Sequence, residues 1–377
     1  MSLLPLLSPA ERSYIRTGLA DPKTPTRLDN RKLDGFRSVQ ISQGDAPQAN
    51  GSSRVVLGGK GGTEVMVGIK LEVVDAAEIG EEADEERQGK ESWRASVEVD
   101  VTPQAYPHLQ SQGLNALSSY FVNLITDHFV PYLPPLAILP PYKYFQPQVH
   151  VSILSSTSAS VPFVLFLALR AAFSNLHVPV TKYVGYEGAT SGDTIPDNST
   201  GTGADDDMGA GFVGGDAGLT GAVRAPRGNT AAQKKARRGG KGKERQMKIT
   251  GKGRAEYVAG PGDDWDLEDL GGGDEGEGEL MERSVRLGLP ACVTLNLIPD
   301  TEKYFLDASR QEEIACPSRL HLFFSSRTST SSLGELKVCG LRIEGGEPID
   351  LGRLPGLLLE GKRIAMEIMN DTNKVME

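Results

Sequence analysis

The chain has 377 residues, of which 38% are hydrophobic, and a formal net charge of −10. This length suits one large domain or two smaller ones, and the acidic balance excludes a chain that binds nucleic acid through its overall charge. Three scattered cysteines and five histidines, none at metal-ligand spacing, predict neither a disulfide framework nor a metal site. We therefore expect reduced thiols and no cofactor. Because the net charge is negative, any contact with nucleic acid is expected only at a local basic patch.

The first elements along the chain are a helix and then a run of strands. Ser8, Pro9 and Glu11 have the pattern of a helix start with a capping box, and the helix is expected to end near Gly18. Alternating or continuous apolar residues predict strands over 39–42, 53–57, 64–73 and 93–101. We expect these four strands to form an antiparallel meander.

The next stretch alternates helices and strands. Apolar residues at steps of three and four predict an amphipathic helix over 114–128. A strand over 149–154, a buried helix over 161–176 and a strand over 180–186 follow. The 161–176 segment is shorter than the ~20 residues that a bilayer needs and contains Arg170, so no membrane span is expected.

The composition changes from residue 188 to residue 282, where Gly, Asp, Thr and Lys are frequent and large apolar residues are few. Such a segment cannot bury enough apolar area to offset its ordering entropy, so we predict a disordered insertion. Residues 224–254 hold twelve Lys or Arg, and residues 263–282 hold ten Asp or Glu. The basic block has two open interpretations, a nuclear import signal or nucleic-acid arm and a solvated tail that the acidic block partly neutralises. Its core residues are Lys234, Lys235, Arg237 and Arg238.

After the insertion, strands are predicted over 291–298, 304–307, 320–325 and 336–343, and a final helix over 355–375. Residues 1–187 and 283–377 together then read as an α+β domain. It has two similar halves, each a sheet followed by helices.

Three motifs outside the insertion resemble one family. Residues 27–31 read R-L-D-N-R and precede Phe36-Arg37, residues 50–70 resemble a first hairpin, and residues 306–313 read L-D-A-S-R-Q-E-E. This ordered series resembles RNase PH-like proteins over about residues 8–187 and 284–375. The last motif resembles the branch that contains the non-catalytic subunits of the exosome ring.

The resemblance implies the ribosomal protein S5 domain 2-like fold in a ring of six related subunits. It implies other RNase PH-like ring subunits, S1/KH-type cap subunits, an associated exoribonuclease and RNA as partners. It also implies a place in the nucleus and nucleolus and in the cytoplasm. The expected role is scaffolding and RNA guidance during 3′-to-5′ RNA processing and decay.

Features expected of active RNase PH-like enzymes are missing. Where they carry Gly-Gly-Thr-Arg at a strand-to-helix junction, residues 155–160 read S-S-T-S-A-S. Residues 284–290 contain no acid, and residues 107–142 contain no Lys or Arg. We predict a non-enzymatic subunit without catalytic residues. The alternatives are an active phosphate-dependent 3′-to-5′ exoribonuclease and another S5-like protein, such as a metabolite-binding domain.

Several residues are singled out by the resemblance. Arg54 and Arg31 are candidate RNA contacts, although Arg54 could equally be an ordinary surface arginine. Asn30 stands where the family usually has glycine, and asparagine tolerates the left-handed backbone of such a turn. The acidic signature residues are Asp29, Asp307, Glu312 and Glu313. The last three fit a strand end and turn held by hydrogen bonds to the backbone better than a catalytic carboxylate cluster.

Overall fold

The computed structural model describes residues 7–75, 94–139, 142–157, 160–184, 248–249, 255–256, 264–267, 278–326, 335–346 and 350–376. The chain divides into one unit of Met1–Val184 with Asp263–Glu377 and a second unit of Gly185–Gly262. In the second unit the described residues form one antiparallel pair, β9 (Lys248–Ile249) with β10 (Ala255–Glu256). The basic residues 234, 235, 237 and 238 lie outside the described residues.

The first helix, α1 (Pro9–Ala20), begins as the sequence predicts. The Ser8 hydroxyl accepts a hydrogen bond from the Glu11 amide at 3.2 Å, and the Glu11 carboxylate accepts one from the Ser8 amide at 2.8 Å. This capping box satisfies amides that have no partner within the helix. The helix continues two residues past the predicted end at Gly18, and it packs against the short helix α6 (Arg310–Ala315).

The first sheet has the order β1-β2-β3-β6-β4, with β5 (Leu136–Leu139) paired to β6. Strands β1 (Val39–Gln43), β2 (Gly51–Leu57) and β3 (Thr63–Asp75) form the predicted antiparallel meander. The prediction that the fourth strand continues this meander is wrong. Instead β4 (Ser96–Val101) runs parallel to β6 (Lys143–Ser155), which separates it from β3. Alternating valines predict a strand but not its partner, and the helix between β4 and β6 supplies the crossover that parallel neighbours need.

The second sheet is antiparallel, in the order β14-β13-β15-β16. Its strands are β14 (Tyr304–Phe305), β13 (Ala291–Leu297), β15 (Arg319–Ser325) and β16 (Lys337–Glu344). One of its faces is covered by α7 (Leu354–Met376), which follows the 3-10 turn η3 (Leu351–Arg353). Two sheets, each followed by helices, confirm the predicted α+β class.

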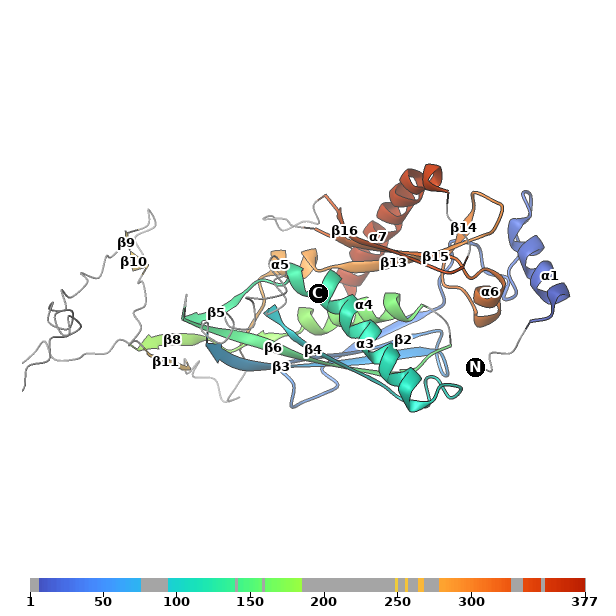
Figure 1. Ribbon diagram of the computed structural model, residues 1–377. Coiled ribbons are helices and arrows are strands. Elements are labelled where there is room, and N and C mark those ends of the chain that lie inside the picture. Colours follow the sequence, from blue (N-terminus) through green and yellow to red (C-terminus); the bar gives the residue numbers. More distant parts are fainter. Residues whose placement is uncertain are drawn as a thin grey trace, which may run out of the picture. The chain divides into compact units, whose positions relative to one another are not determined.

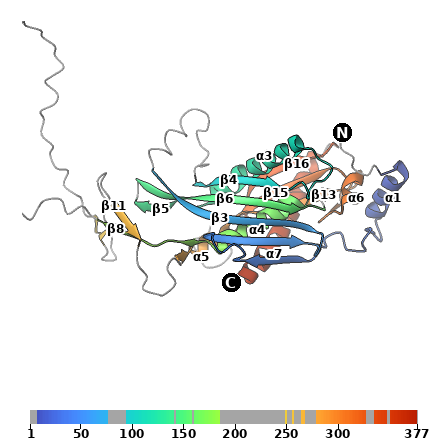
Figure 2. The same ribbon diagram turned by 90° about the horizontal axis from the view of Figure 1, so that it is seen from below.

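Two helices lie between the sheets (Figures 1 and 2). They are α3 (Ser111–His128), which leads into the 3-10 turn η2 (Val130–Tyr132), and α4 (Val161–Ser174). Every residue of α4 is buried, because the helix packs on β2 and β3 and also on β13. A helix enclosed on all sides needs an apolar surface all round. This explains why its sequence shows little periodicity.

Residues at the border of the predicted insertion pair with the first half of the chain. Strand β11 (Asp264–Leu267) pairs with β8 (Thr181–Val184), and β12 (Glu279–Leu280) pairs with β7 (His177–Val178). Helix α5 (Arg283–Gly288) then leads into β13. Part of the 188–282 range is therefore sheet, formed by segments too short for a periodicity signal. Among the described residues, no helix is long and apolar enough to cross a membrane.

Close packing between α3 and the second sheet gives a test of this arrangement. The His128 ring stacks on Phe323 with centroids 4.3 Å apart and lies against Gly340 of β16, where an added Cβ would be 2.6 Å from His128 Cε1. We expect Gly340→Ala to lower the free energy of unfolding by about 1–3 kcal/mol in urea denaturation, because the stacked ring must move. Gly68→Ala is the control, since a Cβ there meets nothing within 4 Å. An equal loss in both variants would contradict the packing.

A polar cluster also joins α3 to this sheet. The Glu344 carboxylate accepts a hydrogen bond from the Tyr120 hydroxyl, and it lies 3.4 Å from His321 Nε2 and 3.3 Å from Arg319 Nε. Burial raises the pKa of Glu344, but His321, Tyr120 and Arg319 outweigh it and lower the pKa to about 2. The ionised carboxylate is therefore favoured in the folded state.

This shift predicts a stability loss in acid. The ordinary pKa of Glu344 is 4.5, so its stabilising contribution is complete above that pH and disappears as the pH falls toward 2. We expect the urea midpoint of the wild-type chain to fall over this range. The fall should be shallower in Glu344→Gln, which has no carboxylate to protonate. Equal slopes in the two chains would show that Glu344 is not linked to folding.

Candidate functional site

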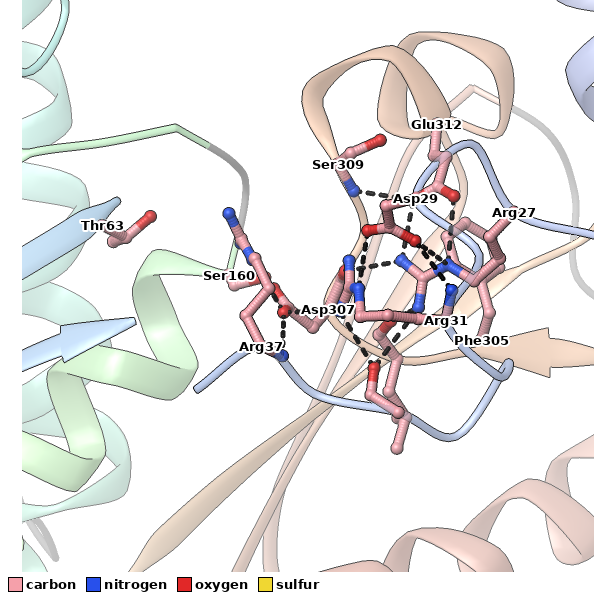
Figure 3. A network of polar contacts seen from close by, with 12 residues as sticks. Arg27, Asp29, Arg31, Arg37, Thr63, Ser160, Phe305, Asp307, Ser309 and Glu312 are labelled. Atoms are coloured by element: carbon pink, nitrogen blue, oxygen red, sulfur yellow. Dashed lines mark hydrogen bonds and ion pairs between the residues drawn. The ribbon is translucent and has the colours of Figure 1, made fainter. Parts of the chain in front are cut away.

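Three arginines from one short segment converge on the turn between β14 and α6 (Figure 3). The segment lies between α1 and β1, and its carboxylate partners in the turn come 270 to 285 positions later in the chain. We call this group the arginine–carboxylate cluster. Its members are Arg27, Arg31, Arg37, Asp29, Asp307 and Glu312. Three arginines face three carboxylates, so the formal charges cancel.

The centre of the cluster is a buried pair between Arg27 and Glu312, whose side chains are both 0% exposed. Arg27 donates to both carboxylate oxygens, from Nε at 3.0 Å and from Nη2 at 2.8 Å. It also donates to the carbonyls of Leu306 at 2.9 Å and Asp307 at 2.7 Å. Because Glu312 accepts from the Ser309 amide at 2.8 Å as well, the same carboxylate caps α6 and holds the arginine.

Asp307 is the second buried carboxylate. Its Oδ2 accepts from Arg31 Nη1 and from Arg37 Nε, both at 2.8 Å, and its Oδ1 accepts from Arg37 Nη2 at 2.5 Å. The Ser160 hydroxyl, at the start of α4, donates to Oδ1 at 3.1 Å. Burial raises the pKa of Asp307, but hydrogen bonds and charge from Arg37, with the charge of Arg31, hold that pKa below its usual value.

Two turns in the cluster use left-handed backbone. Asn30 has φ +60° and Asp307 has φ +44°. The prediction that Asn30 adopts the left-handed backbone of this turn is confirmed. Asp29 orients the turn, since its carboxylate accepts from the Arg31 amide at 3.2 Å and from Arg31 Nε at 2.6 Å.

The junction between β6 and α4 lies beside Asp307. Thr157 Oγ1 accepts from Arg37 Nη1 at 3.1 Å and lies 3.3 Å from Thr63 Oγ1, while Ser155 donates to the Gly62 carbonyl at 2.6 Å. Residues 158 and 159 lie outside the described ranges. The described junction residues therefore present hydroxyls, and the cations beside them already bind Asp307.

Three of the four acidic signature residues, Asp29, Asp307 and Glu312, thus bind arginine side chains as well as backbone amides. The expected hydrogen bonds to the backbone exist, from the Arg37 amide to Asp307 at 2.8 Å and from Ser309 to Glu312. Glu312 is fully buried and Glu313 half-buried, in line with adjacent side chains that point different ways. Within the described ranges, no three His, Cys, Asp or Glu side chains are grouped as a metal site would require.

The two candidate RNA contacts lie in different settings. Arg31 belongs to the cluster, with its side chain 17% exposed. Arg54 lies on the open face of β2, 48% exposed, and pairs with Glu64 at 2.7 Å beside a surface hollow of about 300 Å³ that Lys60 also lines. Both RNA contacts stay predictions.

The candidate residues omit Arg27 and Arg37, which belong to the cluster, and Ser160, which donates to Asp307 from the start of α4. A signal for the two arginines was present in the sequence, because both stand in the first motif and the last motif contains acids with which such cations can pair. No sequence signal points to Ser160, since its contact with Asp307 depends on how α4 packs under the second sheet.

Comparison with known proteins identifies the fold. No family model and no curated protein sequence matches the chain. Among solved structures, an Archaeoglobus fulgidus exosome with RNA bound to the active site is similar at 16% identity and TM-score 0.50. The alignment covers 96% of this chain and 97% of the archaeal chain. An archaeal exosome core is also similar, at 16% identity and TM-score 0.49, with 96% of each chain covered. Rice (Oryza sativa) Rrp46 is similar at 11% identity and TM-score 0.45, with 93% of this chain and 100% of the Rrp46 chain covered.

The chain therefore has the α+β fold of the RNase PH-like exosome structures. This agrees with the fold that the motifs imply. The likeness covers nearly all of the chain and also of its structural neighbour. At 16% identity it establishes the fold alone.

Proposed function

We propose that this chain is a non-catalytic subunit of an RNA exosome ring, which scaffolds the assembly and guides RNA toward an associated exoribonuclease. The fold, with its likeness to an exosome structure over 96% of the chain, supports the ring role. Among ring subunits, the motif series is most similar to the ribosomal RNA-processing protein 42 type. RNase PH-like ring subunits, S1/KH-type cap subunits and RNA are the proposed partners, and the nucleus, nucleolus and cytoplasm the proposed locations.

The position of Asp307 is the observation that supports a non-catalytic role most directly. Phosphorolysis requires inorganic phosphate to bind next to the last phosphodiester, with cations and hydrogen-bond donors around it. At the start of α4, Arg37 and Ser160 donate instead to the buried Asp307 carboxylate, and so does Arg31. A phosphate ion that approached the start of α4 would meet the negative charge of Asp307 and arginines that are already paired with it. This arrangement favours a structural role.

The test is an RNA decay assay on the purified chain, with and without inorganic phosphate, and an active phosphorolytic exosome as positive control. The released product to measure is nucleoside diphosphate. We expect no release above the blank at any phosphate concentration. Phosphate-dependent release by the isolated chain would favour the active exoribonuclease instead.

A further inference from the structure

Five donors surround the Asp307 carboxylate. Oδ1 accepts from Arg37 Nη2 and the Ser160 hydroxyl, while Oδ2 accepts from Arg37 Nε, the Arg37 amide and Arg31 Nη1. The Arg37 guanidinium therefore binds the carboxylate with two parallel hydrogen bonds, the geometry with which arginine recognises carboxylate and phosphate. We call these donors of Arg31, Arg37 and Ser160 the oxyanion receptor.

The receptor has anchors that do not depend on Asp307. Arg31 Nε binds Asp29 at 2.6 Å, and its Nη1 also donates to the Gly35 carbonyl at 3.0 Å. Arg37 Nη1 donates to Thr157 Oγ1 at 3.1 Å. Removal of the Asp307 carboxylate would thus leave two oriented arginines facing a space of carboxylate size, and three cluster arginines against two carboxylates.

The receptor borders solvent although its occupant is buried. The side chains of Arg31 and Arg37 are 17% and 21% exposed, whereas that of Asp307 is 0% exposed. The two arginines therefore extend from the buried carboxylate to the protein surface. Asp307 itself adopts φ +44°, a conformation that costs an L-residue energy and that glycine adopts freely.

We infer that Asp307 is a tethered anion that fills an oxyanion receptor of Arg31, Arg37 and Ser160, and that the receptor binds a free small oxyanion, formate or phosphate, once this side chain is removed. The inference deepens the proposed function, because it names the Asp307 carboxylate as the group that keeps phosphate from binding to Arg31, Arg37 and Ser160. In the wild-type chain the receptor is occupied, so no free anion should bind there.

The experiment uses Asp307→Gly in the full-length chain, which removes the carboxylate and suits the left-handed backbone. Thermal unfolding is followed in sodium formate, sodium phosphate and sodium chloride at equal ionic strength. We expect formate and phosphate, but not chloride, to raise the melting temperature of the variant, by roughly 5 °C at a hundred times the dissociation constant. If the variant is unfolded in chloride, recovery of a cooperative transition in formate is the equivalent result.

Two matched controls separate binding from general salt effects. The melting temperature of wild type should rise no more in formate than in chloride. Phosphate stabilises proteins generally, so only the rise in Asp307→Gly that exceeds the rise in wild type is evidence of binding. Asp307→Asn loses the charge but still fills the space, so it should not respond to formate. The inference is overturned if Asp307→Gly responds no more than Asp307→Asn, or stays unfolded in every anion. Neither outcome measures whether the wild-type chain degrades RNA. The RNA decay assay therefore tests the proposed function independently of this experiment.

Discussion

Replacement of Arg27 by methionine is expected to lower the free energy of unfolding by about 3–5 kcal/mol, because it leaves Glu312 as a buried charge without its partner. The arginine also satisfies the carbonyls of Leu306 and Asp307, so the variant loses hydrogen bonds between the N-terminal segment and the β14–α6 turn. Chemical denaturation followed by circular dichroism measures this loss.

A double-mutant cycle identifies the pair as the cause. Glu312→Leu should be comparably destabilised, and Arg27→Met/Glu312→Leu should lose clearly less than the sum of the single variants, since no buried charge remains unpaired. Arg363→Ala breaks exposed pairs with Glu360 and Glu367 on α7 and should cost no more than about 1 kcal/mol. Strict additivity of the two buried substitutions would refute the coupling.

The second large effect is expected at Phe323, which connects the layers. Its ring lies 4.9 Å from that of Phe166 in α4 and 4.3 Å from that of His128 in α3, and it is fully buried. We expect Phe323→Ala to lower the free energy of unfolding by about 3–5 kcal/mol, through lost apolar burial and the cavity that remains.

The control for this prediction is Val338→Ala on the neighbouring strand β16, where the side chain is 49% exposed. It should change stability by less than about 0.5 kcal/mol. A single cooperative transition in both variants is expected if the second sheet folds together with α3 and α4. Separate transitions of the two sheets in Phe323→Ala would contradict that packing.

The elements with a strong local signal were predictable from the sequence. The α1 cap at Ser8, the first three strands and the buried 161–176 helix depend on neighbouring residues and appear nearly as predicted. The partner of β4 did not follow from the sequence, because alternation specifies a strand but leaves its neighbour open. Helix α6 is only six residues long, too short for a periodic pattern.

The site was predictable in some of its residues but not in its contacts. The two motifs that hold Arg27 and Glu312 stand out in the sequence, yet 285 positions separate them and nothing local indicates that they meet. The role of Ser160 depends on the packing of α4 beneath the second sheet, and the angle of a helix on a sheet is a tertiary property. The sequence therefore points to the acids of the cluster and to Arg31, whereas the roles of Arg27 and Arg37 emerge only from the fold.

The most direct test of the ring role is affinity purification of the tagged chain from its own cells, with native mass spectrometry of the recovered assembly. We expect one copy of this chain with five other RNase PH-like subunits and S1/KH-type cap proteins. Recovery of the chain alone, or only with proteins unrelated to RNA decay, would contradict it.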